Sequence, residues 1–135
     1  MTIENISYYL DKFNYDYTIK NNSVIVNLGY NQIISVDISE NHSIIIKDEL
    51  KGWNPLTGLI VMSFKKVMAY NTIGLILIFA FFLFFNVKKE VSMFYTAVPI
   101  VIFSIWIIVW SLYYHIKLEF FKHFLLKIFM ECERN

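Results

Sequence analysis

Residues 51–74, KGWNPLTGLIVMSFKKVMAYNTIG, form the stretch in which the character of the chain changes. Before it, short runs of apolar and polar residues alternate, and after it the chain enters a long run without charged residues. The stretch itself holds a tryptophan, an Asn-Pro pair and two consecutive lysines. Because tryptophan and lysine side chains favour the headgroup level of a bilayer, the stretch predicts the passage from a water-exposed domain into membrane helices.

Two uncharged runs follow this stretch, the first between Lys66 and Lys88 and the second between Glu90 and His115. In the first run, a dozen apolar residues contribute on the order of −5 kcal/mol to membrane insertion. The second run has 24 residues, and as a helix it would be about 36 Å long, enough for a hydrocarbon core of about 30 Å. Each run therefore predicts a transmembrane helix. A buried hairpin in a soluble core is the alternative, but a chain of 135 residues has little to bury two such helices against.

The predicted membrane hairpin has its helices at residues 67–87 and 91–114, with a short extracytoplasmic connector at residues 88–90. The connector is too short for a domain, so both termini are expected on one side. Five lysines lie near the spans on that side and two lie in the connector: Lys65, Lys66, Lys117, Lys122 and Lys127 against Lys88 and Lys89. The positive-inside rule then places both termini in the cytoplasm. A bias toward Asn, Ile, Lys and Tyr indicates an AT-rich bacterial or phage coding sequence, so a bacterial inner membrane is expected.

Residues 1–52 are predicted to form a small cytosolic α+β domain ahead of the hairpin. Ile3, Ile6, Leu10 and Phe13 recur at helical spacing, which predicts one amphipathic helix. Four short alternating runs follow, YDYTIK, SVIVNL, QIISVDI and SIIIKD, and turn-forming residues separate them. The pattern predicts a four-stranded antiparallel meander with the helix packed on one face.

Alternation sorts the strand residues onto two faces. The face that the helix is expected to cover holds only apolar side chains: Tyr15, Tyr17, Ile19, Val24, Val26, Leu28, Ile34, Val36, Ile38, Ile44 and Ile46. The other face is polar except for Ile25, Ile33 and Ile45. These isoleucines are either scattered surface residues, which are common, or a docking stripe for a partner or a second copy. Because so small a domain buries only about 60% of its chain surface, we predict a partner-binding site at these residues.

The segment 53–66 is predicted to be interfacial and to lead into the first membrane helix. Asn54 followed by Pro55 is a helix-start signal, because Asn caps helices and Pro favours the first helical position. The segment would then lie along the membrane surface or form the first turns of the long helix. Six side chains are predicted to lie at the membrane interface: Trp53, Lys65, Lys66, Trp110, Tyr113 and Tyr114.

Residues 115–135 are predicted to form a cytosolic juxtamembrane helix that continues the second span and lies at the interface or packs on the helix from Pro55. His115, Glu119 and His123 are spaced four residues apart, so they share one face of this helix. Such a face either binds a transition metal or is an exposed polar ridge with hydrogen bonds between turns. The pattern lacks a fourth ligand, so we expect no metal site.

The sequence carries no recognisable catalytic constellation. It has no Gly-rich phosphate loop, no HExxH motif and no Ser–His–Asp candidate. The single cysteine, Cys132, lies between two acidic residues that disfavour its thiolate. One arginine and no basic stripe give no sign of nucleic-acid binding. We therefore expect neither enzyme activity nor a cofactor.

The predicted spans carry no ionisable side chain in their interiors, whereas proton relays and most transporters need such groups at membrane depth. The leading hypothesis is a non-enzymatic membrane protein that anchors, scaffolds or oligomerises within a membrane complex, with a cytosolic docking domain. Its expected partners are the lipid bilayer and either further copies of itself or other membrane subunits. The alternative hypothesis is a membrane-disrupting effector, of the toxin or antiphage type, whose hairpin clusters under control of the small domain.

Overall fold

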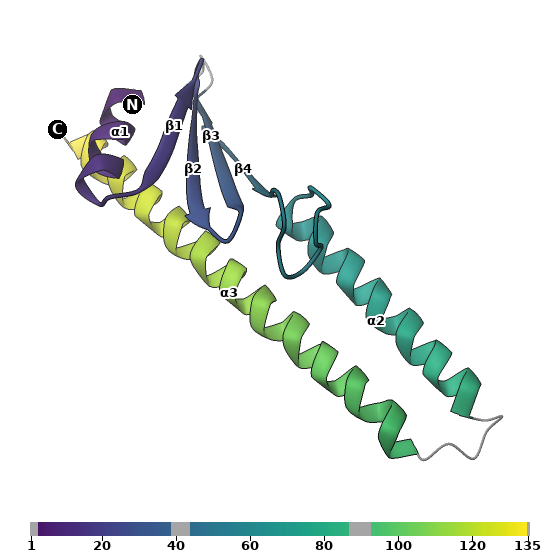
Figure 1. Cartoon of the computed structure of the whole chain (residues 1–135). Coiled ribbons are helices and arrows are strands. Elements are labelled where there is room, and N and C mark those ends of the chain that lie inside the picture. Colours follow the sequence, from purple (N-terminus) through teal and green to yellow (C-terminus); the bar gives the residue numbers. More distant parts are fainter. Residues whose placement is uncertain (1–2, 39–43, 87–92, 135) are drawn as a thin grey trace.

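The computed structural model describes residues 3–38, 44–86 and 93–134 (Figure 1). The chain forms one short helix, a four-stranded antiparallel sheet and then two long apolar helices, in the order that the sequence predicts. The elements are α1 (Ile3–Lys12), β1 (Asp16–Lys20), β2 (Ser23–Gly29), β3 (Gln32–Ile38), β4 (Ile44–Leu50), α2 (Phe64–Asn86) and α3 (Met93–Arg134).

The sheet is a meander in which each strand pairs with the next along the chain, in the order β1-β2-β3-β4. In the register, Val24 on β2 lies opposite Val36 on β3, so apolar side chains of neighbouring strands share a face. A tight turn joins these two strands, and Tyr30 and Asn31 within it have φ values of +48° and +62°. Two consecutive residues with positive φ are typical of a hairpin turn that follows the twist of the strands. The predicted turn between β3 and β4 lies outside the described residues.

The predicted division of the sheet into two faces is confirmed for the two central strands. Five side chains expected in the core are buried: Val24, Val26, Leu28, Ile34 and Val36. Ile44 and Ile46 on β4 are partly buried against the same cluster. Ile19 on the edge strand β1 is instead 49% exposed, and the side chain of Ile38 is outside the described part.

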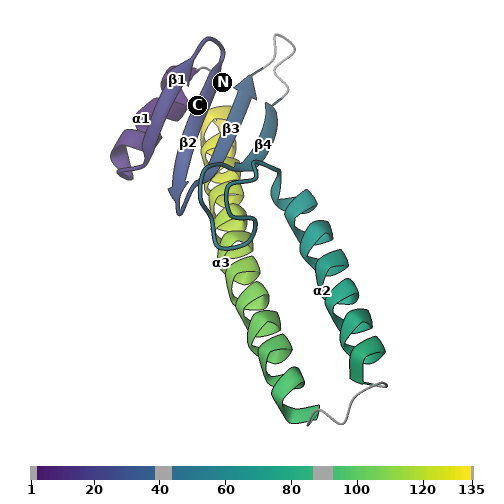
Figure 2. The ribbon, with the colours of Figure 1, turned by 45° about the vertical axis from the view of Figure 1, so that its right-hand side comes forward.

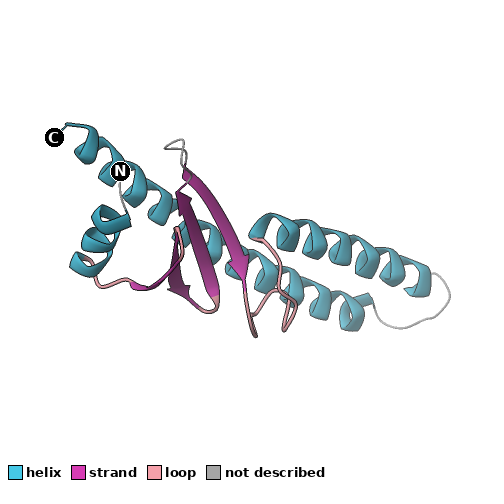
Figure 3. Ribbon diagram, turned by 90° about the horizontal axis from the view of Figure 1, so that it is seen from above, coloured by secondary structure: helices cyan, strands magenta, loops and turns pink. Residues whose placement is uncertain are grey.

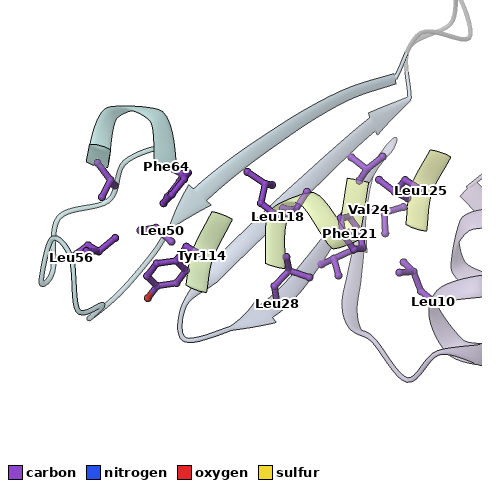
Figure 4. Packing of buried hydrophobic residues seen from close by; sticks show 14 of the residues in the cluster. Leu10, Val24, Leu28, Leu50, Leu56, Phe64, Tyr114, Leu118, Phe121 and Leu125 are labelled. Carbon is purple, nitrogen blue, oxygen red and sulfur yellow. The ribbon is translucent and has the colours of Figure 1, made fainter. Parts of the chain in front are cut away.

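α3 supplies most of the cover over the apolar face of the sheet (Figures 2 and 4). One side of its C-terminal half is buried at alternating spacings of four and three residues, and we call this set the buried stripe: Ile107, Ser111, Tyr114, Leu118, Phe121, Leu125 and Ile128. α1 adds Ile6 and Leu10 to the same core. The prediction that α1 packs on the sheet is right but incomplete. With 10 residues, α1 is only about 15 Å long, whereas the seven-residue strands β2 and β3 are about 23 Å long, so α1 covers only part of this face. The sequence predicts the helix at residues 115–135 either at the membrane interface or on the helix from Pro55. Neither alternative includes packing against the sheet.

The helix expected to begin at Pro55 does not form, and the chain makes a loop there instead. Asn54 does act as a cap, because its Oδ1 accepts the amide N–H groups of Leu56 and Thr57 at 3.1 and 3.0 Å. The backbone then closes after one turn through two hydrogen bonds of 2.9 Å between Asn54 and Gly58. Gly58 has a φ of +63°, a left-handed conformation that ends helical turns, so the chain reverses.

α2 begins at Phe64, several residues beyond the Asn-Pro pair. The backbone N–H of Phe64 donates to Oδ2 of Asp48 on β4, and the two atoms lie 2.7 Å apart. A carboxylate at this position satisfies an otherwise unpaired amide and interacts favourably with the positive end of the helix dipole. The start of α2 is therefore fixed by a contact with the sheet, which no local sequence signal reveals.

Replacing Gly58 by alanine is expected to lower the free energy of unfolding by about 1–2 kcal/mol, the cost of a left-handed φ for an L-residue. Gly74→Ala is the matched control, because an added Cβ meets nothing within 4 Å at either glycine. Gly74 lies inside α2, where alanine is favoured over glycine by about 0.5–1 kcal/mol, so the sign should reverse. Thermal unfolding of both variants in one detergent measures the difference in their free energies of unfolding. An equal loss of stability at Gly58 and Gly74 would contradict the left-handed conformation of Gly58 in the loop.

α2 and α3 run side by side and project away from one end of the sheet (Figures 1 and 3). They contain 23 and 42 residues, which gives lengths of about 34 Å and 63 Å. α3 continues through Pro99, so the second predicted span and the predicted juxtamembrane helix form one uninterrupted element. Both helices are long and apolar enough to cross a membrane.

Candidate membrane interface

Aromatic side chains gather where the sheet meets the two long helices. The ring centroid of Trp110 on α3 lies 5.4 Å from that of Tyr30 and 5.6 Å from that of Tyr113. Tyr114 and Trp106 follow at 6.1 Å and 5.8 Å from Trp110. Edge-on and tilted aromatic contacts contribute about 0.5–1.5 kcal/mol each beyond the area they bury. The structure thus places two predicted interface residues, Trp110 and Tyr113, against the β2–β3 turn of the sheet.

Tyr114 belongs to the core rather than to the surface of this group. Its side chain is fully buried, and its hydroxyl donates to the backbone oxygen of Tyr30 at 2.9 Å. Its backbone oxygen accepts a hydrogen bond from Nε2 of the buried Gln32 at 3.1 Å. Tyr114 therefore holds the β2–β3 turn onto α3 and offers no surface to a lipid headgroup.

Tyr30 is an exposed aromatic residue of this group that the sequence reasoning missed. It is 61% exposed, although its ring contacts both Trp110 and Tyr113. The available signal was weak, namely an aromatic residue within the turn-forming run GYN. Its place beside α3 depends on contacts between residues that are some eighty positions apart, and no local pattern reveals those.

The predicted basic anchors lie at the start of α2, close to the same aromatic group. The ring of Phe64 lies 6.5 Å from that of Tyr114 and stacks on that of His115 at 6.2 Å. Lys65 and Lys66 follow directly on α2 and are both exposed. The structure therefore brings the two lysines to the level of the aromatic residues on α3.

Trp53 lies near the start of the loop between β4 and α2, and this loop carries further exposed apolar side chains. Trp53 is 65% exposed and Leu59 is 76% exposed. Two hydrogen bonds fasten the loop: Nδ2 of Asn31 donates to the backbone oxygen of Trp53 at 2.6 Å, and Nε1 of Trp106 donates to that of Pro55 at 3.0 Å. The indole N–H of Trp106 thus fastens this loop to α3.

A hollow of about 460 Å³ opens beside the aromatic group, between the start of β1, the end of β2 and α3. Asp16 and Lys117 place charges of both signs in its lining, next to the exposed Phe120. Nζ of Lys117 donates to the backbone oxygen of Leu28 at 2.6 Å and lies 4.8 Å from the ring centre of Tyr113. The ammonium group of Lys117 is thus engaged with the sheet.

The three isoleucines predicted to bind a partner do not form one continuous stripe. The register makes Ile25 and Ile33 diagonal neighbours on β2 and β3, whereas Ile45 lies opposite Asp37 on the far row of β4. Nζ of Lys47 lies 2.7 Å from Oδ2 of Asp37, and this hydrogen bond lowers the pKa of the Asp37 carboxyl. The ion pair makes the surface beside Ile45 polar. Ile45 is 48% exposed, whereas Ile25 and Ile33 are partly buried, and partner binding at the three isoleucines stays a prediction.

Two of the three polar residues of α3 that raised the question of a metal, His115 and Glu119, are engaged in other contacts. Among the residues that the structure describes, no three His, Cys, Asp or Glu side chains are arranged to hold a metal ion. Oε1 of Glu119 lies 2.7 Å from Nζ of Lys122, and the ring of His115 stacks on Phe64. These contacts favour the interpretation of an exposed polar ridge.

Comparison with known proteins adds no relative to this picture. No family model, no curated protein and no solved structure matches the chain. The arrangement of aromatic, basic and apolar side chains at the junction of the sheet and the long helices must therefore carry the functional argument.

Proposed function

We propose that this chain is a non-enzymatic integral membrane protein that anchors, scaffolds or oligomerises within a membrane complex. In this proposal, α2 and α3 cross the bilayer as a hairpin, and the sheet lies at the cytoplasmic surface. The exposure of the two long helices is the observation that best supports it. In the windows long enough to span a membrane, 11% of the α2 residues and 17% of the α3 residues are buried. A core helix of a soluble protein would be mostly buried.

From Ile73 to Phe84, the exposed surface of α2 is apolar on every side. Its exposed large hydrophobic side chains are Met68, Tyr70, Ile73, Ile76, Leu77, Ile78, Phe79, Phe81, Leu83 and Phe84. Consecutive residues turn by about 100° around a helix, so the run from residue 76 to 79 alone points in all directions. Soluble monomers rarely expose apolar patches larger than a few hundred Å². Hydrocarbon accepts such a surface, because a helix satisfies its backbone hydrogen bonds internally.

The aromatic and basic side chains support a bilayer boundary near the start of α2. Over its 23 residues, α2 spans about 34 Å, slightly more than a hydrocarbon core of about 30 Å. Lys65 and Lys66 then lie at the headgroup level, together with Trp110 and Tyr113 on α3, and their polar tips remain hydrated. The loop that begins at Trp53 enters the same layer.

The orientation in the membrane rests on the count of lysines. Lys117 is engaged with the sheet, so it is left out of the count. Four lysines on the side of the termini remain against two in the connector: Lys65, Lys66, Lys122 and Lys127 against Lys88 and Lys89. The positive-inside rule still favours cytoplasmic termini, in a membrane that we take to be a bacterial inner membrane.

Two features support a role as anchor or scaffold. The predicted spans lack charged side chains, and α1 and α3 leave one face of the sheet uncovered. Residues 67–87 and 91–114 contain no Asp, Glu, Lys, Arg or His, and proton relays and most transporters need such groups at membrane depth. On the sheet, Ile25 and Ile33 provide a small apolar patch beside polar residues. Such a patch suits contact with a partner subunit.

Carbonate washing of membranes tests the proposed location. We expect the chain to stay in the membrane pellet, because two apolar spans hold it there. In a Cys132→Ser background, Lys89→Cys should react with an impermeant thiol reagent from outside the cell, and Tyr8→Cys should react only after the membrane is opened. Release of the chain into the supernatant, or labelling of both cysteines from one compartment, would exclude the proposal.

The alternative function, a membrane-disrupting effector, predicts a different membrane potential, which can be measured in the same cells. A potential-sensitive dye should report an unchanged membrane potential on overexpression if the chain is an anchor, and a collapsed potential if it is an effector. Purification in a mild detergent then tests the scaffold role. A strictly monomeric chain without any partner would contradict that role.

A further inference from the structure

A second row of side chains runs along α3 on the side opposite to the sheet. Its members are also spaced alternately by four and three residues, and we call them the outer stripe: Val98, Ile102, Ile105, Val109, Leu112, Ile116, Glu119, His123, Leu126 and Met130. The eight apolar members are between 38% and 64% exposed. His123 is two residues from Phe121 of the buried stripe, or about 200° around the helix. The outer stripe therefore points away from the sheet, which lies on the other side of α3 (Figure 2).

Lipid can cover only part of the outer stripe. With Tyr113 at the headgroup level, Leu126 and Met130 lie about 20 Å and 26 Å further along the helix. The headgroup layer is only about 5–8 Å thick on each side of a bilayer. Because α3 is one continuous helix that packs under the sheet, its C-terminal half cannot lie down on the membrane surface. The apolar residues from Ile116 to Met130 therefore face either water or protein.

We propose that a second copy of this chain covers the outer stripe, so that two α3 helices pair in parallel as a coiled coil. This inference rests on the proposed membrane location, which gives every copy the same orientation. A two-fold axis along the membrane normal then brings the same stripe of two copies face to face in register. Each sheet lies on the outer side of its own α3, where it does not obstruct the contact.

Between Val109 and Leu126, the apolar residues of the outer stripe are of the types that favour two strands. In a heptad repeat, Val109 and Ile116 occupy successive a positions there, and Leu112 and Leu126 occupy d positions, whereas the d positions before them hold Val98 and Ile105. β-branched residues at a, combined with leucine at d, favour parallel two-stranded coiled coils. The seam thus runs from the membrane-spanning part of α3 into the part beneath the sheet without a break in spacing.

The two polar members of the outer stripe complement one another in such a pair. Glu119 occupies a d position and His123 the following a position, so each Glu119 comes within one layer of the partner's His123. Nζ of Lys122 lies 2.7 Å from Oε1 of Glu119, and this positive charge offsets the repulsion between the two glutamates. Polar residues in a coiled-coil seam lower its stability but fix its register and number of strands.

Disulfide cross-linking in native membranes tests the pairing. In the full chain with Cys132→Ser, Leu126→Cys places a cysteine in the seam beyond the reach of lipid. Tyr8→Cys is the control, because Tyr8 lies on α1 and is 64% exposed, against 55% for Leu126. Mild oxidation should convert Leu126→Cys to a covalent dimer and leave Tyr8→Cys monomeric. Similar yields for both variants would indicate random collision and overturn the inference.

The mass of the detergent-solubilised chain gives a second, independent measurement. The chain should have the mass of two copies, and Leu126→Lys should reduce it to one, because two lysines would meet in the seam while the exposed side chain leaves the fold of each copy intact. A chain that stays in the carbonate-washed pellet and copurifies with a different partner, but neither cross-links nor shows the mass of two copies, overturns the coiled coil alone. A chain that leaves the membrane overturns the proposed function as well.

Discussion

Replacing Phe121 by alanine is expected to loosen the sheet from α3 and to lower the free energy of unfolding by about 3–5 kcal/mol. Phe121 is 1% exposed at the middle of the buried stripe. Its ring lies 5.5 Å from that of Tyr15 and 6.0 Å from that of Phe124. Truncation removes these contacts and leaves a cavity that rigid neighbours fill only in part. Since whole domains are stable by only about 5–15 kcal/mol, the loss is large, and the melting temperature should fall by at least about 10 °C.

Phe120→Ala is the matched control, because it makes the same chemical change one position along the helix. Phe120 is 71% exposed, and an exposed truncation is expected to change the free energy of unfolding by no more than about 0.5 kcal/mol. Thermal unfolding in detergent, followed by the near-ultraviolet circular dichroism of the aromatic residues, measures both variants. If both substitutions lower the free energy of unfolding by the same small amount, the C-terminal half of α3 does not pack under the sheet. The fold is then wrong in that region.

The C-terminal half of α3 shows what the sequence could not predict, namely which side of a helix packs against the sheet. Helical periodicity identifies a face when apolar residues occupy one side only. Here Leu118 and Phe121 lie on one side of α3, while Ile116 and Leu126 lie on the opposite side, so the pattern is apolar on both. Periodicity then predicts a helix correctly but cannot say which side meets the sheet. The decision depends on contacts with strands that are far away in the sequence.

The strands were more predictable because alternation has only two outcomes. The run predicted as SVIVNL forms β2 (Ser23–Gly29), and Val24 and Val26 are buried as expected. Alternation assigns each residue to a face, but it does not say which residues on that face are neighbours. That depends on the register, which separates Ile45 from Ile25. Alternation therefore placed the three isoleucines on one face, but only the register shows that Ile45 is not a direct neighbour of the other two.

The misplaced helix start has a local cause that the sequence did contain. The Asn-Pro signal was weighed without Gly58, which follows Asn54 by four residues. Glycine at that distance favours a left-handed residue and a closed single turn. The capping chemistry of Asn54 was thus predicted correctly, and the length of the structure that it caps was not. The true start of α2 depends on Asp48, whose carboxylate reaches the helix from a neighbouring strand.

Replacing Leu77 by lysine is expected to cost about 3–4 kcal/mol in membrane insertion, because a central lysine is unfavourable by about 2.5–3.5 kcal/mol and the favourable leucine is lost as well. Leu77 lies near the middle of α2 and is 63% exposed. Tyr8→Lys is the control, since Tyr8 on α1 is exposed to nearly the same extent, 64%. Leu77 is exposed to lipid if α2 crosses the bilayer, whereas Tyr8 is exposed to water. Lysine distinguishes them, because it is tolerated in water and penalised in hydrocarbon.

The measurement is the fraction of chain that resists carbonate extraction and carries the Lys89→Cys label on the outer side. Leu77→Lys should reduce that fraction strongly, since a cost of about 3 kcal/mol corresponds to more than a hundredfold change in an equilibrium. Tyr8→Lys should leave it unchanged. If water surrounded α2, both substitutions would fall within about 0.5 kcal/mol of neutral, as exposed changes usually do. Equal tolerance of the two lysines would therefore mean that protein or water, and not lipid, covers α2, and the membrane anchor would have to be abandoned.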